Sequence, residues 1–249
     1  MESNLSVTEY CFSAPVPGPL KFAFISDLHC CRNAPVLDKL SQLKPDAVLV
    51  GGDFIHSNIK FQEGFAFLRE SAEKFPTFCS IGNHELRYQG DLHSAIRETG
   101  VTCLDNAFLD FQGVLLGGLT SALREQRIPN RFFLTQVPDL GFLHRYARTP
   151  GYKLLLCHHP EYYPRYIRPL PIDLMLAGHA HGGQIRFFNH ALYAPGQGIF
   201  PRYTGGIHEN RLIVGRGLGN TAFFPRINND PEIVVIRLTP AEEASPSDG

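Results

Sequence analysis

The sequence predicts an α/β fold, and three observations support this prediction. Between residues 20 and 100, short apolar segments alternate with amphipathic ones. The apolar segments are typical of strands buried on both faces of a sheet, and the amphipathic segments have the residue spacing of helices. Several apolar segments also end in polar residues, at the position where parallel sheets form their binding sites.

The first half of the chain contains three strand–helix pairs. The helical spacing is clear in the first pair, where leucines recur at Leu37, Leu40 and Leu43 and Pro45 follows. Gly100 ends the third predicted helix. The expected strands are 20–29, 46–55 and 77–85, and the expected helices are 34–45, 64–75 and 91–100.

The second half repeats the pattern with shorter strands. We expect one helix within residues 133–147. No repeat or linker divides the chain, so we expect an N-terminal segment over 1–19, one domain over 20–238 and a disordered acidic tail over 239–249. The expected strands are 114–119, 153–160, 172–181, 212–219 and 232–238.

The composition indicates a single globular domain. The chain has 249 residues, is 43% hydrophobic and carries a formal net charge of -1, so it lacks the basic surface typical of nucleic-acid binding. Six cysteines form no CxxC pair and no disulfide framework, which indicates a reducing cytoplasm. We expect neither a signal peptide nor a transmembrane segment, and peripheral membrane contact stays open.

Side chains with the chemistry of metal ligands follow the predicted strands. They combine carboxylate, imidazole and amide groups without a thiolate, which favours Mn, Fe, Co, Zn or Mg over a structural zinc site. Their number exceeds what one ion needs, so the pattern indicates a two-metal site. The residues at these strand ends are Asp27, His29, Asp53, Asn83, His84, His158, His179 and His181.

The order of these motifs resembles that of a known superfamily. The series Asp-x-His, Gly-Asp, Gly-Asn-His-Glu, His and Gly-His-x-His, spread over residues 20–238, resembles the calcineurin-like metallophosphoesterases. The variant GHAHGGQI resembles their bacterial phosphodiesterase branch. The resemblance implies a four-layer α-β-β-α sandwich of two mixed sheets, the metallo-dependent phosphatase-like fold.

The same resemblance implies a role for each residue of the site. Asp53 would bridge two divalent ions, with a hydroxide between them that attacks phosphorus, and His84 would be catalytic, contacting the phosphate and assisting the leaving oxygen. The first ion would be held by Asp27, His29 and His181. The second ion would be held by Asn83, His158 and His179.

Such a site predicts the hydrolysis of a phosphodiester or pyrophosphate bond. Two cations neutralise the charge of the substrate and lower the pKa of a bound water. We expect a small-molecule or lipid-linked phosphate ester as substrate, with Mn, Fe, Zn or Co as the ions. One alternative is a pyrophosphohydrolase of a nucleotide-activated lipid such as UDP-diacylglucosamine. The other is a metal-free interaction scaffold of the same fold.

Two residues beside the motifs need a choice between roles. Alternation along the strand and the family pattern His-x-Pro favour His158 as the ligand, with His159 facing substrate or solvent. Glu85 is expected to support the site or begin a helix rather than bind metal.

The remaining polar and aromatic residues carry weaker predictions. Cys30 and Cys31 are expected to be packing residues, and 161–171 forms either an apolar rim for a substrate or a packed loop. The histidines without a motif are expected at the surface: His56, His93, His144, His190 and His208. Four arginines are either phosphate contacts or ordinary surface residues: Arg87, Arg165, Arg202 and Arg216.

Overall fold

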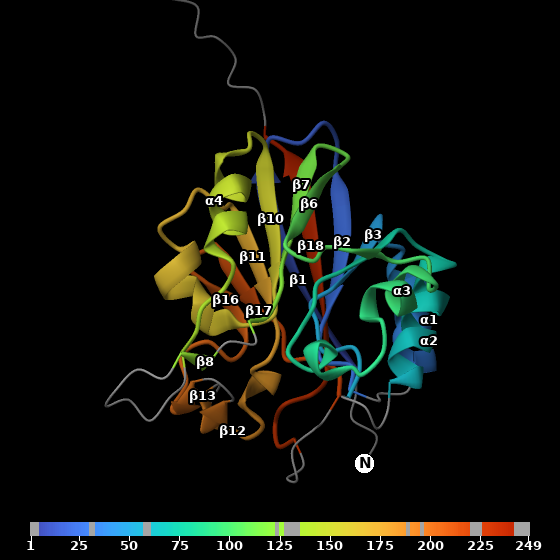
Figure 1. The fold of residues 1–249 in the computed structure, drawn as a ribbon, viewed down its shortest axis with the longest axis vertical. Helices are drawn as coiled ribbons and strands as arrows, with labels where there is room; N and C mark the ends of the chain where they lie inside the picture. Colours follow the sequence, from blue (N-terminus) through green and yellow to red (C-terminus); the bar gives the residue numbers. More distant parts are fainter. Residues whose placement is uncertain are drawn as a thin grey trace, which may run out of the picture.

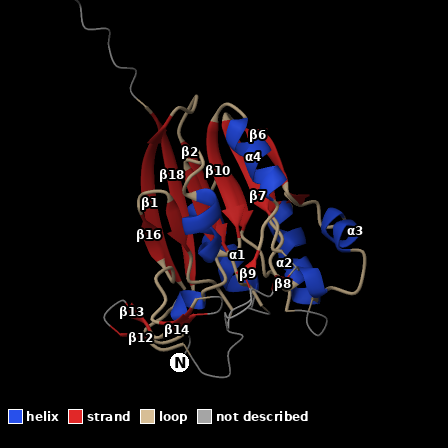
Figure 2. Ribbon diagram, turned by 60° about the vertical axis from the view of Figure 1, so that its left-hand side comes forward, coloured by secondary structure: helices blue, strands red, loops and turns tan. Residues whose placement is uncertain are grey.

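Two six-stranded sheets lie face to face in the computed structural model, with helices on both outer faces (Figures 1 and 2). The structure describes residues 5–29, 33–56, 61–122, 125–126, 135–187, 190–194, 197–219 and 226–241. The predicted α/β class and the four-layer α-β-β-α arrangement are confirmed.

The first sheet has the strand order β1-β18-β2-β3-β4-β5. β2 to β5 run parallel to one another, β18 runs antiparallel to β2, and β1 pairs parallel with β18. This sheet is therefore mixed. Its strands are β1 (Ser6–Ala14), β2 (Leu20–Ile25), β3 (Ala47–Val50), β4 (Thr77–Cys79), β5 (Thr102–Cys103) and β18 (Glu232–Pro240).

The second sheet has the order β16-β17-β11-β10-β7-β6, with four parallel central strands and an antiparallel strand at each edge. Its strands are β6 (Ala107–Phe111), β7 (Val114–Leu119), β10 (Tyr152–Cys157), β11 (Leu174–Ala177), β16 (Gly206–His208) and β17 (Leu212–Val214). Three two-stranded ribbons consist of β8 (Glu125–Gln126) with β9 (Thr135–Gln136), β12 (Arg186–Phe187) with β13 (His190–Ala191), and β14 (Tyr193–Ala194) with β15 (Gly198–Ile199).

Helices cover the outer face of each sheet (Figure 1). The first sheet is covered by α1 (Asn33–Leu43), α2 (Gln62–Ala72) and α3 (Leu92–Arg97), and the second by α4 (Leu140–Arg148). Asp91 and Asp139 cap the N-termini of α3 and α4, accepting hydrogen bonds from the backbone N–H of Ser94 and Phe142. Each predicted helix is therefore present.

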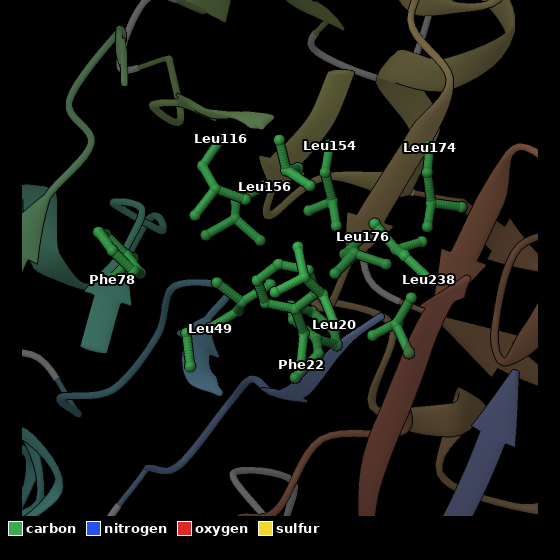
Figure 3. Packing of buried hydrophobic residues seen from close by; sticks show 14 of the residues in the cluster. Leu20, Phe22, Leu49, Phe78, Leu116, Leu154, Leu156, Leu174, Leu176 and Leu238 are labelled. Carbon is green, nitrogen blue, oxygen red and sulfur yellow. The ribbon is translucent and has the colours of Figure 1, made fainter. Parts of the chain in front are cut away.

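Three apolar layers hold the four layers of the fold together. Side chains alternate along the strands, so Phe22 and Phe24 of β2 point between the sheets while Ala23 and Ile25 pack under the helices. Leucines from both sheets fill the central layer, as Figure 3 shows. This two-sided burial explains why the strand sequences are almost continuously apolar.

The strands that lead to the predicted site end earlier than expected. The segment 20–29 leaves the sheet after Ile25, and 172–181 leaves it after Ala177. Asp27 and His179 have positive φ angles of 53° and 64°, which a strand cannot contain. The polar ends of these segments are therefore loops.

The ends of the chain add structure that we did not predict. The segment 1–19 contributes β1, which pairs with β18 over its whole length. β18 itself continues to Pro240, and residues 242–249 of the predicted tail lie outside the described residues. Within the described ranges, no helix has the length and apolarity to span a membrane.

Candidate metal centre

The predicted ligands lie in loops that follow parallel strands of both sheets. β2, β3 and β4 of the first sheet lead to Asp27, Asp53 and Asn83. β10 and β11 of the second sheet lead to His158 and His179 and run toward the end of the molecule where β12 and β13 lie (Figure 1). Since carboxyl ends of parallel strands share one edge, the fold gathers these side chains from distant parts of the sequence.

The loops that carry these residues have an unusual backbone conformation. A left-handed conformation in a residue other than glycine costs about 1–2 kcal/mol, and such residues cluster at functional sites. Five predicted ligands adopt it, with φ between 37° and 64°: Asp27, His29, Asp53, His179 and His181. The fold therefore maintains local strain at these positions.

The first group of side chains consists of Asp27, His29 and His181, all buried. Oδ1 of Asp27 lies 3.5 Å from Nε2 of His181 and 3.8 Å from Nε2 of His29. Ser26 Oγ and the backbone N–H of His179 donate hydrogen bonds to Asp27 and hold its carboxylate in place.

The second group consists of Asp53, His158 and His179. Nδ1 of His158 donates to the carbonyl of Gly51 at 2.8 Å, and Nε2 lies 3.1 Å from Oδ2 of Asp53. Burial opposes the charge on this ring, but the neighbouring Asp53 outweighs it and raises the pKa of His158 to about 10. Asn83 precedes His84, whose backbone N–H donates to Oδ1 of Asp53 at 2.9 Å.

Asp53 connects the two groups. Its Oδ2 is 3.5 Å from Nε2 of His29 in the first group, and His158 Nε2 is 3.8 Å from Oδ1 of Asp27. The two groups are thus adjacent, with the carboxylate of Asp53 between them.

The donor atoms fit divalent ions. Buried polar atoms in proteins are normally paired. Here Nε2 of His29, Nε2 of His158 and Oδ1 of Asn83 are buried and lack a hydrogen-bond partner within the described part of the chain. Burial lowers the pKa of His29 and of His179 to about 3, so both imidazoles are neutral, as metal ligation requires. The site offers lone pairs that only a cation or a hydrogen-bond donor satisfies.

Glu85 belongs to neither group, but it binds the backbone of the loops that carry Asp53 and Asn83. This buried carboxylate accepts hydrogen bonds from the backbone N–H groups of Gly82 and Asp53, both at 2.8 Å, and of Ile55 at 3.1 Å. Burial, reinforced by Asp53, raises the pKa of Glu85 to about 8. Gly82 is required here, because a Cβ would lie 2.3 Å from Oδ1 of Asp53. Glu85 therefore has the supporting role that we predicted.

His84 and His56 form a pair of histidines beside the two groups. Nε2 of His84 is 3.9 Å from Oδ2 of Asp53, and its side chain is 18% exposed. The rings of His56 and His84 stack at 5.1 Å. His29, His56 and His84 also form a third set of potential ligand atoms within 4.8 Å of one another.

The prediction that His56 lies at the surface is therefore wrong. His56 is half-buried, and its Nδ1 has no hydrogen-bond partner among the residues described. Its position three residues after Asp53, in the same loop, was the available signal.

We expected His159 to face either substrate or solvent, and it does not face solvent. His159 is 3% exposed and donates through Nδ1 to Oε1 of Glu161 at 2.9 Å. The aromatic segment 161–171 is a packed loop rather than a rim, because Tyr162, Tyr163 and Ile167 are buried against the second sheet.

The other polar residues lie as follows. Arg216 donates to Ser6 and Glu232, which is a structural role. His208 is half-buried beside Tyr203, contrary to the prediction. Cys30, Cys31 and the side chain of His190 lie outside the described residues. His93 and His144 are exposed as expected. Arg87, Arg165 and Arg202 are exposed, which leaves both of their predicted roles open.

Comparisons with known proteins agree with this geometry. The sequence profile of the calcineurin-like phosphoesterases matches residues 20–183. The chain is 30% identical to phosphodiesterase YaeI of Escherichia coli, over 88% of this chain and 82% of that protein. It is 26% identical to the uncharacterized protein YpbG of Bacillus subtilis, over 88% and 81%. It is 25% identical to UDP-2,3-diacylglucosamine pyrophosphatase LpxG of Chlamydia muridarum, over 88% and 83%. The chain therefore belongs to the calcineurin-like phosphoesterase family, and it is a metal-dependent hydrolase of phosphate esters.

Proposed function

We propose that this protein hydrolyses a phosphodiester or pyrophosphate bond with two divalent ions held side by side. The observation that carries the proposal is the adjacency of the two ligand groups, with Asp53 Oδ2 3.1 Å from His158 Nε2 in one group and 3.5 Å from His29 Nε2 in the other. A carboxylate between two sets of ligands is typical of a two-metal site.

The seven predicted ligands divide between the two ions. Asp27, His29 and His181 would hold the first, Asn83, His158 and His179 the second, and Asp53 both. The bound ions would supply positive charge against the phosphate and lower the pKa of the attacking water. The protein holds neutral imidazoles at His29 and His179 and two oriented carboxylates ready for the ions, and His158 would give up its Nε2 proton on loading.

His84 is proposed to act on the leaving group. Its Nε2 is close to Asp53, and its side chain is more exposed than those of the buried ligands His29 and His158. Burial lowers the pKa of His84 despite the neighbouring Asp53. The ring would therefore donate a hydrogen bond to the departing oxygen from its neutral form.

A second candidate function is the hydrolysis of a lipid-linked pyrophosphate. The relative LpxG is named for such a substrate, and this chain exposes apolar side chains next to the metal loop. Ile199 and Phe200 are 75% and 76% exposed, and Ile199 pairs with Tyr193 of β14, a strand that contacts the segment His181–Gly183. Exposed apolar surface near a site favours an apolar substrate group.

The metal-free scaffold is not favoured, because Nε2 of His29 and Oδ1 of Asn83 are buried and make no hydrogen bond to any described residue. We also propose a reducing location such as the cytoplasm, because Cys11, Cys79, Cys103 and Cys157 are free.

A substrate panel tests the proposal. The purified protein with Mn should hydrolyse an aryl phosphodiester, a dinucleoside pyrophosphate or UDP-diacylglucosamine faster than an aryl phosphomonoester. Asp53→Asn should reduce that activity to background. Asp46→Asn, at the other end of β3, is the matched control and should retain activity. A fully active Asp53→Asn protein would refute the bridging role.

A further inference from the structure

A carboxylate lies behind the second ligand group. Oε1 of Glu161 accepts a hydrogen bond from Nδ1 of His159 and lies 4.0 Å from Nε2 of His179. The rings of His159 and His179 are 4.4 Å apart. Glu161, His159 and His179 thus form a compact cluster that shares His179 with the ligands of the second ion.

Two atoms of this cluster are left without partners. Oε2 of Glu161 and Nε2 of His159 are both buried and make no hydrogen bond to any described residue. A buried carboxylate oxygen without a donor is destabilising, so an N–H group that approaches it gains more than it would in water. Nε2 of His179 lies 4.0 Å from Oε1 of the same carboxylate, so its N–H group would reach Glu161 after a small shift.

We propose that Glu161 positions His179 for the second ion. An imidazole that gives one nitrogen to an ion carries its proton on the other, and a carboxylate that accepts this proton fixes the orientation and tautomer of the ring. Nε2 of His179 lies on the side of Glu161, so Nδ1 is the nitrogen left to bind the second ion together with Asp53 and His158. This inference rests on the proposed function, since it takes His179 to be a ligand.

His159 acts as a clamp on Glu161 in this arrangement. Its hydrogen bond to Oε1 restrains a side chain that is otherwise 26% exposed. The hydrogen bond from Nδ1 thus ties the ring of His159 to the carboxylate of Glu161. No comparable carboxylate contacts His181 of the first group among the described residues except its co-ligand Asp27. The effect of Glu161 should therefore be confined to the second ion.

Calorimetric titration of the metal-free, full-length protein with Mn²⁺ tests the inference. Wild type should show two binding steps. Glu161→Gln should weaken one step about 10–100-fold and leave the other within about twofold of wild type. The matched control is Glu209→Gln, whose carboxylate is equally exposed at 27% but pairs with Arg168 and Arg202 instead of histidines. Glu209→Gln should retain both steps.

Three other outcomes would contradict the inference. Equal affinities in Glu161→Gln and wild type would show that the carboxylate does not act on His179. Equal weakening of both steps would indicate a general effect on folding. Three ions in wild type and two in Glu161→Gln would make Glu161 a direct ligand. If the proposed two-metal function itself is wrong, the wild-type protein would bind fewer than two Mn²⁺ ions in the same titration, which separates that failure from failure of the inference about Glu161.

Discussion

The two sheets supply different chemistry to the metal centre. Loops of the first sheet carry the proposed oxygen ligands Asp27, Asp53 and Asn83, together with His29. The proposed ligands on loops of the second sheet are all imidazoles: His158, His179 and His181. The carboxylates that would attract and bridge the ions are therefore on the first sheet, and the imidazoles that would complete each site are on the second.

A carboxylate contacts the loops at the carboxyl end of each sheet, here called the first and the second edge, but it does so in different ways. On the first sheet, Glu85 accepts three backbone N–H groups and ties the loops after β3 and β4 together. On the second sheet, Glu161 contacts side chains, His159 and His179. Substitution of Glu85 should therefore affect the fold of the loops after β3 and β4. Substitution of Glu161 should affect only the orientation of the proposed ligand His179.

The largest effect is expected on the first edge, at His84. His84→Ala should lower the turnover of a phosphodiester substrate about 10²–10³-fold, since it removes the hydrogen-bond donor proposed for the departing oxygen. Metal content, measured by elemental analysis, should equal that of wild type, because His84 is not among the proposed ligands. His158→Ala on the second edge should instead lose metal. Metal loss in His84→Ala would move that residue into the ligand set and weaken the comparison.

The next effect is on stability, at Glu85. Glu85→Ala would leave three buried N–H groups without their acceptor, which should lower the free energy of unfolding by about 3 kcal/mol or more. For a chain of this size, the midpoint of thermal unfolding should fall by about 6–12 °C. Glu70→Ala, an exposed position on α2, is the control and should change little. A stable Glu85→Ala protein would show that the first edge does not depend on this brace.

These contrasts also show what the sequence could predict. Strand-end motifs located Asp27, Asp53 and the histidines of β10 and β11, because parallel strands necessarily bring their carboxyl ends together. His56 escaped prediction because its only signal, a position three residues after Asp53, is not part of a recognised ligand motif. The buried orientation of His159 depends on its hydrogen bond to Glu161, a contact between side chains that alternation along a strand does not encode. β1 escaped because its partner, β18, is at the other end of the sequence.

Removing the ions should weaken the connection between the two edges. Each proposed ion takes ligands from both sheets, so it links them and stabilises only the folded chain. At Mn concentrations about 100 times the dissociation constant, the stabilisation is about 2.7 kcal/mol. Excess EDTA should therefore lower the unfolding midpoint by about 5–10 °C, and EDTA already saturated with Mn should not. An unchanged midpoint after complete removal of metal would mean that the edges hold together without it.

The smallest effect is expected at His159, and it separates bracing by side chains from packing. His159→Leu fills the buried position with an apolar side chain and removes the hydrogen bond to Glu161, so it should weaken the second Mn²⁺ step by less than Glu161→Gln does, about 2–10-fold. His159→Asn can still donate a hydrogen bond from a similar position and should lie closer to wild type. The affinity for the second Mn²⁺ ion should thus be lowest in Glu161→Gln, higher in His159→Leu and highest in His159→Asn. This order follows only if His159 acts through the carboxylate of Glu161. If His159→Asn and His159→Leu weaken the step equally, the ring acts through its volume, and the second edge is then held by packing rather than by orientation of its ligands.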